Sequence, residues 1–176
     1  MLKIMVKDLL DGRYTKEKSN LKKLLIGSRM TEVSYNETFN LLLRQSIFDE
    51  KDGEIQMVLT IDAQCWFGNK DEWLTKIETI RDSNSDGERM DCLLASELVR
   101  LRYNNLIQVE KIDFLKDYLT ITFQGNNSLS IAYYAESEYA WLLEEVSPKK
   151  EQERMMICCQ GNELFQNNMP IYLEEI

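Results

Sequence analysis

The stretch LIGSRMTEVSYN, residues 25–36, aligns without gaps with LLASELVRLRYN, residues 93–104, at an offset of 68 residues. The apolar positions agree almost throughout, and the Tyr-Asn pairs that end the two stretches coincide. The same offset places Trp73 over Trp141. Because self-similarity at a fixed period is the sequence signature of repeats, the sequence predicts two tandem copies of one unit.

A third match supports the same interpretation. VLTIDA, residues 58–63, resembles SLSIAY, residues 128–133, at an offset of 70 residues. A small length difference in the intervening turns reconciles the two offsets. The alternative is that short β-rich patterns match by chance.

Each copy has an order of helix and strands that can be read from the sequence. KEKSNLKKLLIG, residues 16–27, has leucines on one helical face and Gly27 where a left-handed helix cap is expected. The predicted strands are RMTEVSY (29–35), FNLLLRQSIF (39–48) and EIQMVLTIDA (54–63) in the first copy, and ELVRLRYN (97–104), DYLTITFQ (117–124) and SLSIAYY (128–134) in the second. Helices at 70–80 and 136–146 close the two meanders, with Trp73 and Trp141 packed on the sheet. The predicted fold class is α+β, with two tandem repeats of a short helix, an antiparallel β-meander and a closing helix.

The segments outside the repeats complete the predicted organisation. Leu2, Met5, Val6 and Leu9 follow helical spacing, which predicts an amphipathic helix near the N-terminus. The predicted parts are an N-terminal helical segment (1–20), repeat unit one (21–80), a linker (81–90), repeat unit two (91–147) and a C-terminal tail or hairpin (148–176).

The composition is that of a globular protein, with 44% hydrophobic and 29% charged residues. No apolar run approaches the roughly 20 residues that a membrane span requires, and the N-terminus is unlike a signal peptide. The four cysteines include no CxxC pair, which is typical of reduced thiols. We therefore expect a cytoplasmic protein with no membrane span.

The chain contains no histidine. Imidazole is therefore unavailable as a base or a metal ligand, which excludes Ser-His-Asp, Cys-His and His-zinc chemistry. A Gly-rich phosphate loop, a GxSxG elbow and a kinase signature are also absent from the sequence. We expect no cofactor and no catalytic residues, although paired carboxylates leave a carboxylate-dependent hydrolase open.

The stretch DSNSDG, residues 82–87, begins like an EF-hand loop, with oxygen ligands at the first, third and fifth positions and glycine at the sixth. Its twelfth position, where a bidentate glutamate belongs, is Leu93. A cluster of Ser, Asn, Asp and Gly between two repeat units is also typical of a solvated linker. We expect a linker rather than a metal site, with calcium binding as the alternative.

The net charge of −9 is unevenly distributed along the chain. Residues 1–29 carry eight basic and three acidic side chains, a charge of +5, which leaves −14 on residues 30–176. An acidic body repels nucleic acid and attracts basic protein surfaces. We expect a basic protein partner and no nucleic acid, although an acidic surface can also serve solubility alone.

Partner-binding residues are predicted where acidic turns lie near aromatic strand ends. The acidic turn contains Asp49, Glu50, Asp52 and Glu54, and the nearby aromatic residue is Trp66. Desolvated aromatic side chains contribute much of the affinity at protein interfaces. The alternative for Trp66 is core packing.

The order of LIGSRMTEV at 25–33, LTI at 59–61 and a following tryptophan resembles small uncharacterised bacterial α+β proteins, some of which are immunity proteins that neutralise polymorphic toxins. The resemblance covers about residues 21–80 and 91–147, and Ala95 replaces the glycine in the second copy. It implies a non-catalytic protein-binding role, such as an immunity or inhibitor protein that covers a basic surface of its target. The alternative is a regulatory docking module attached through the basic N-terminal helix.

Overall fold

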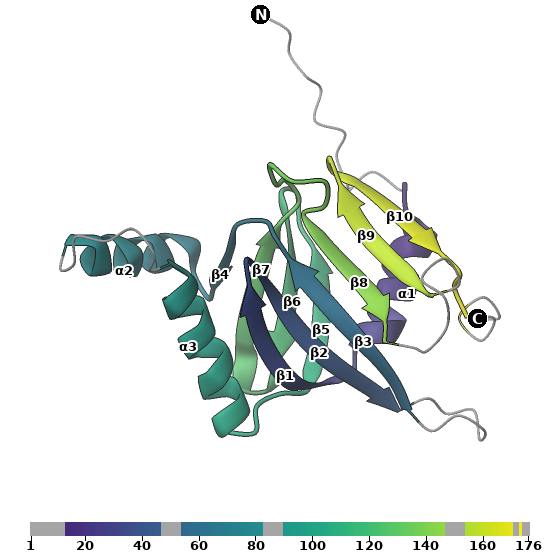
Figure 1. Cartoon of the computed structure of the whole chain (residues 1–176), viewed down its shortest axis with the longest axis horizontal. Coiled ribbons are helices and arrows are strands. Elements are labelled where there is room, and N and C mark those ends of the chain that lie inside the picture. The colour runs from purple at the N-terminus through teal and green to yellow at the C-terminus, as the bar shows by residue number, and fades with distance from the viewer. Residues whose placement is uncertain (1–12, 47–53, 83–89, 147–153, 171–172, 174–176) are drawn as a thin grey trace, which may run out of the picture.

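The computed structural model describes residues 13–46, 54–82, 90–146, 154–170 and 173 (Figure 1). Its elements are α1 (Thr15–Leu25), β1 (Arg29–Asn36), β2 (Thr38–Ser46), β3 (Glu54–Ile61), β4 (Cys65–Phe67), α2 (Lys70–Asp82), α3 (Met90–Tyr103), β5 (Val109–Phe114), β6 (Tyr118–Phe123), a 3-10 turn (Gln124–Asn126), β7 (Asn127–Ala132), β8 (Trp141–Glu145), β9 (Met156–Gln160) and β10 (Glu163–Asn167). This mixture of helices and antiparallel sheets confirms the α+β class.

The strands form a six-stranded sheet in the order β1-β2-β3-β8-β9-β10 and a four-stranded sheet in the order β4-β7-β6-β5. Helix α1 contacts β2 and β10 of the first sheet and β5 of the second. Figure 1 shows α1 and the four-stranded sheet behind the six-stranded one. Burial alternates along β3 and β6, as expected when one face of each strand lies in the core.

Helix α1 forms because its leucines follow helical spacing, and these leucines fix it to the core. Leu21, Leu24 and Leu25 are at most 1% exposed. The helix ends at Leu25, and Gly27 turns the chain just after it with a φ of +88°, in the left-handed region that glycine adopts without strain. The Gln45 side-chain amide donates a hydrogen bond of 2.9 Å to the Ile26 carbonyl next to this turn. The predicted helix with its glycine cap is therefore present.

Two parts of the chain share a helix followed by a three-stranded meander, α1-β1-β2-β3 and α3-β5-β6-β7. Both meanders have an irregular register in their first strand, after Met30 and after Val109. The starts of the two meanders contact each other, since the Met30 amide donates to the Ile107 carbonyl and the Val109 amide donates to the Ser28 carbonyl. The fourth strand of each part then crosses over: β4 pairs with β7, and β8 pairs with β3.

The structure does not confirm the tandem repeat at an offset of 68 residues. Residues 97–104, predicted as a strand, belong almost entirely to α3, because Leu94, Leu98 and Leu101 follow helical spacing and are buried. The predicted helix at 136–146 is wrong as well. Trp141 and Leu143 point to the same buried face of strand β8, whereas Trp73 lies on helix α2.

The match between residues 58–63 and 128–133 has a structural counterpart, because it aligns β3 with β7, the third strands of the two meanders. The two halves correspond differently from the prediction. Strand β4 of predicted unit one pairs with β7 of unit two, and β8 of unit two pairs with β3 of unit one. The two predicted units therefore contribute jointly to both sheets.

The remaining predictions about the ends of the chain have mixed outcomes. The amphipathic helix expected around residues 2–9 lies outside the described residues, and so does most of the DSNSDG stretch, at 83–87. Near the C-terminus, β9 and β10 form a hairpin that turns at Gly161 and Asn162. Within the described ranges, every helix is too short or too polar to cross a membrane.

Candidate functional site

The candidate site lies where the chain crosses between the two sheets. The connection from β3 to β4, residues 62–64, meets the connection from β7 to β8, residues 133–140. The Ala132 amide donates to the Gln64 carbonyl at 2.9 Å, and the Asp62 amide donates to the Ala140 carbonyl at 3.1 Å. These backbone hydrogen bonds hold the two connections together and fix the side chains that project from them.

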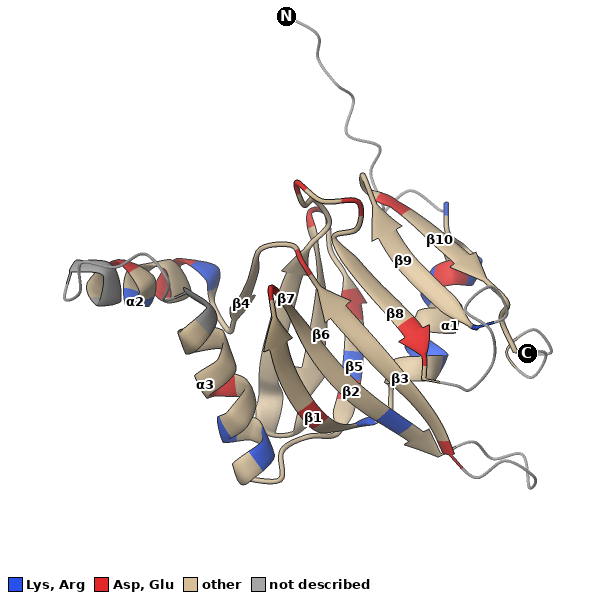
Figure 2. Cartoon of the chain, in the orientation of Figure 1, with Lys and Arg blue, Asp and Glu red and all other residues tan. Residues whose placement is uncertain are grey.

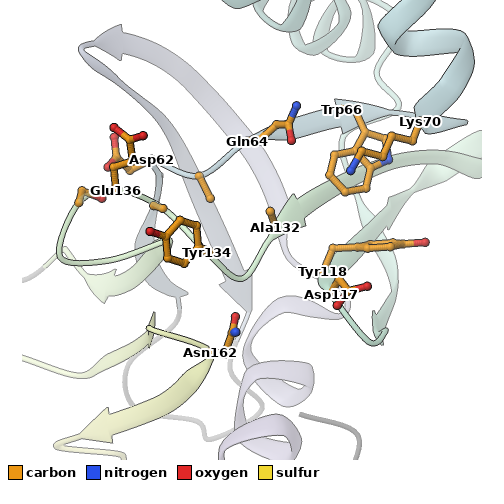
Figure 3. Close-up of a pocket in the computed structure, with 13 residues that line it drawn as sticks. Asp62, Gln64, Trp66, Lys70, Asp117, Tyr118, Ala132, Tyr134, Glu136 and Asn162 are labelled. Carbon is orange, nitrogen blue, oxygen red and sulfur yellow. The ribbon is translucent and has the colours of Figure 1, made fainter. Parts of the chain in front are cut away.

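A groove of about 870 Å³ follows the two crossing connections (Figure 3). It is lined by three carboxylates, three aromatic side chains and one lysine among other residues: Asp62, Asp117, Glu136, Trp66, Tyr118, Tyr134 and Lys70. A cavity of this size is in the range of ligand sites. Its combination of aromatic and acidic side chains suits a cationic group.

One end of the groove is aromatic. Trp66 packs edge-on against Tyr118, with 4.9 Å between the ring centroids. The Lys70 ammonium lies 4.6 Å from the centroid of the Trp66 ring. On the neighbouring strands β6 and β7, the Thr120 and Ser130 hydroxyls form a hydrogen bond of 3.0 Å. With Tyr118 and Lys70 packed against it, Trp66 is only 3% exposed.

The other end of the groove is acidic. In Figure 3, Asp62 and Glu136 lie side by side at this end, and Tyr134 lies between them and the aromatic end. Tyr134 is 68% exposed. No hydrogen bond or ion pair joins the side chains of Asp62 and Glu136 to any part of the chain that the structure describes. Both carboxylates are therefore available to an approaching cation.

The groove belongs to a larger acidic surface, which we call the acidic end. It consists of Glu37, Asp62, Asp117, Glu136, Glu138 and Glu163, located in or next to the connections at one end of the sheets (Figure 2). All of them except Glu163 are exposed. Lys116 is the basic residue in the described connections at this end. Such clustering attracts positively charged partners.

Of the partner-binding residues predicted from the sequence, the structure describes Glu54 and Trp66, and it does not bring these two together. Asp49, Glu50 and Asp52 lie outside the described residues. Glu54 begins β3 and makes an ion pair of 3.7 Å with Arg44. Asp62 follows the other end of the same strand, so the strand rise places Glu54 roughly 25 Å from the groove. Trp66 lines the groove, and its side chain is buried rather than exposed.

Sequence reasoning missed most of the residues that line the groove. Asp62 directly follows a strand, Asp117 directly precedes one, and Glu136 lies in a connection, which are positions where functional side chains are common. Their convergence depends on the crossing of β4 and β8 between sheets, and no local pattern in the sequence indicates that crossing. Tyr134 is the last residue of a predicted strand, and its exposure is the feature that only the structure provides.

The buried cysteines Cys158 and Cys159 provide little chemistry of their own. Burial raises the pKa of the Cys158 thiol to about 11, with a smaller effect of Glu138, and burial raises the pKa of Cys159 to about 12. These two thiols therefore stay protonated near neutral pH. Among the described residues, no three His, Cys, Asp or Glu side chains are placed to hold a metal ion.

The sequence matches no family model, and it has no significant match among curated proteins or solved structures.

Proposed function

We propose that this chain is a non-catalytic protein-binding protein of the inhibitor or immunity type, which covers a basic surface of its target. The observation that supports this function best is the groove at the acidic end, where exposed carboxylates surround aromatic side chains. Opposite charges steer the encounter of two proteins and fix their relative orientation. Aromatic side chains at the centre of such a contact contribute much of the affinity.

The groove replaces the acidic turn predicted at residues 49–54 as the first region to test. Its carboxylates converge on one surface, whereas Glu54 is engaged by Arg44 at the far end of β3. Exposed charges interact over roughly 10 Å at 0.1 M salt. A basic segment lying in the groove is therefore within range of Asp62, Asp117 and Glu136 together.

The test compares three immobilised proteins in affinity capture from an extract of the source cells. The first is the wild type, and the second combines Asp62→Asn, Asp117→Asn and Glu136→Gln. The third is a control with the same charge change at exposed sites outside the groove, combining Glu32→Gln, Glu78→Gln and Glu110→Gln. We expect a basic protein to be retained by the wild type and the control and lost from the groove variant. Equal capture by all three proteins contradicts the proposal.

A carboxylate-dependent hydrolase is a second candidate. It is favoured by the side-by-side placement of Asp62 and Glu136 at one end of the groove (Figure 3). Two converging carboxylates are the arrangement that acid and base catalysis of glycoside hydrolysis requires. Purified protein that hydrolyses a panel of glycosides, with activity lost in Asp62→Asn, favours this candidate over binding alone.

The regulatory docking module, attached through the basic N-terminal helix, remains a third proposal. That predicted helix lies outside the described residues, and the basic helix α1 is the nearest described part that supports such an attachment. Arg13, Lys18 and Lys22 line a hollow of about 450 Å³ on α1 together with Asp113 and Phe114. The Lys18 and Lys22 ammonium groups lie 5.6 and 5.9 Å from the Phe114 ring centroid. Loss of partner capture in Lys22→Met, with capture retained in the groove variant, favours docking through this basic helix.

A further inference from the structure

The aromatic end of the groove already contains a cation. The Lys70 ammonium lies over the Trp66 ring at 4.6 Å from its centroid, which is within the range for attraction between a cation and an aromatic face. Tyr118 contacts Trp66 edge-on. Figure 3 shows the Lys70 and Tyr118 side chains next to Trp66 at this end of the groove. The indole face under Lys70 is thus the surface that another cation would use.

Lys70 is weakly held in this position. It is the first residue of α2, and Asn69 caps the helix by accepting hydrogen bonds from the Asp71 and Glu72 amides at 2.9 and 3.1 Å. A positive charge at a helix N-terminus is repelled by the helix dipole. No ion pair of Lys70 occurs with the described residues. The Trp66 ring is therefore the main attraction that keeps the ammonium in place.

The groove offers a better match to a guanidinium group than to an ammonium. Arginine stacks its planar guanidinium on aromatic rings and can still donate hydrogen bonds from its edges to a carboxylate. Asp117 precedes Tyr118 in the chain and lines the same groove, and its carboxylate is exposed. A ligand with its guanidinium on the Trp66 face therefore shares the groove with the Asp117 carboxylate, and the rest of the ligand extends past Tyr134 toward the acidic end.

We propose that the corner of the groove formed by Trp66, Tyr118 and Asp117 is a subsite for an arginine side chain of the partner protein, and that Lys70 occupies it in the unbound state. This inference rests on the proposed function, because it names the group that the groove recognises. Lys70 swings away when arginine enters, so each binding event displaces an internal competitor.

The strength of this competition sets the expected effect of removing Lys70. An exposed cation–aromatic contact favours the closed arrangement, with Lys70 over the Trp66 ring, by roughly twofold to fivefold over the open arrangement, in which Lys70 has moved away. Apparent affinity falls in proportion to the fraction of protein in the open state. Lys70→Met should therefore tighten binding of an arginine probe by about threefold to sixfold.

The experiment titrates the protein with N-acetyl-arginine N-methylamide and follows the indole N–H signals of its three tryptophans by NMR. The same titration uses the lysine analogue and the neutral citrulline analogue, which keeps the size of arginine without its charge. Lys76→Met is the matched control, because Lys76 is an exposed lysine on the same helix and its replacement changes the net charge equally. Thermal melting checks that each variant is folded.

We expect arginine to shift one indole signal, to bind more tightly to Lys70→Met than to the wild type, and to bind equally to Lys76→Met and the wild type. Asp117→Asn should weaken this binding. Equal tightening in both lysine variants overturns the proposal, because net charge alone then explains it. A stronger response to the lysine or citrulline analogue also overturns it.

The result is independent of the partner protein. If the arginine probe does not bind but capture of a partner still depends on the charge of the groove, the arginine subsite is excluded and the proposed function stands. If the probe binds but capture of a partner does not depend on the charge of the groove, the proposed function is excluded and the groove still contains a guanidinium site.

Discussion

Replacement of Trp66 separates the structural role of this side chain from a role as an exposed anchor. Trp66 is 3% exposed and packs on Tyr118, so Trp66→Ala removes a large buried side chain. Substitutions of buried Phe or Trp by Ala typically cost about 3–5 kcal/mol in the free energy of unfolding. For a protein of this size, each kcal/mol lowers the melting temperature by about 2–4 °C. The predicted decrease is therefore about 6–20 °C.

The matched variant is Tyr134→Ala, which removes an aromatic side chain from the same groove. Tyr134 is 68% exposed, and surface substitutions usually change stability by no more than about 0.5 kcal/mol. Its melting temperature should therefore stay within about 2 °C of the wild type.

The assay is thermal unfolding followed by circular dichroism, with both variants measured at the same protein concentration. A large decrease for Trp66→Ala and almost none for Tyr134→Ala supports the burial that the structure describes. If Trp66→Ala melts within about 2 °C of the wild type, the side chain is not packed as described, and the contacts of Lys70 and Tyr118 with it are contradicted.

Three further predictions concern other parts of the chain. Gly27→Ala should cost about 1–2 kcal/mol in chemical denaturation, because alanine is strained at a positive φ and the added Cβ meets only ordinary contacts with Gln45; an unchanged midpoint contradicts the glycine-dependent turn. Iodoacetamide at pH 8 should label exposed Cys92 before Cys158 and Cys159, since burial raises the pKa of the latter two thiols and they ionise only well above pH 9; peptide mapping that finds Cys158 labelled first contradicts this. About 5 mM calcium should leave the melting temperature unchanged, because the DSNSDG stretch lacks the acidic twelfth ligand; a clear rise restores the calcium-loop alternative.

The local elements could be predicted where one periodicity dominates. The leucines of α1 and the alternating residues of β3 and β6 each satisfy a single pattern, so their identity follows from residues 16–25, 54–61 and 118–123. Residues 97–104 satisfy two patterns, because their apolar side chains fit both alternation and helical spacing. Burial of Leu94, Leu98 and Leu101 on one side of α3 decides between them, and this burial depends on distant parts of the chain.

The site was less accessible to prediction than the fold class. Residues 62, 117 and 136 come from separate connections, and they meet because β4 and β8 each join the sheet of the other meander. Pairing between strands so far apart in sequence leaves no local signature. The sequence did indicate an acidic body, but it could not indicate that the acidic side chains gather where the strands cross.

The most direct test of the central claim measures binding of the isolated partner to the wild type between about 50 and 500 mM salt, a range in which the Debye length shrinks about threefold. The measurement is repeated with the variant that combines Asp62→Asn, Asp117→Asn and Glu136→Gln. The proposed function predicts that the association rate of the wild type falls steeply with salt, and that the groove variant associates slowly at low salt with a weaker salt dependence. A partner that binds both proteins equally well across the whole range contradicts binding of a basic surface in the acidic groove.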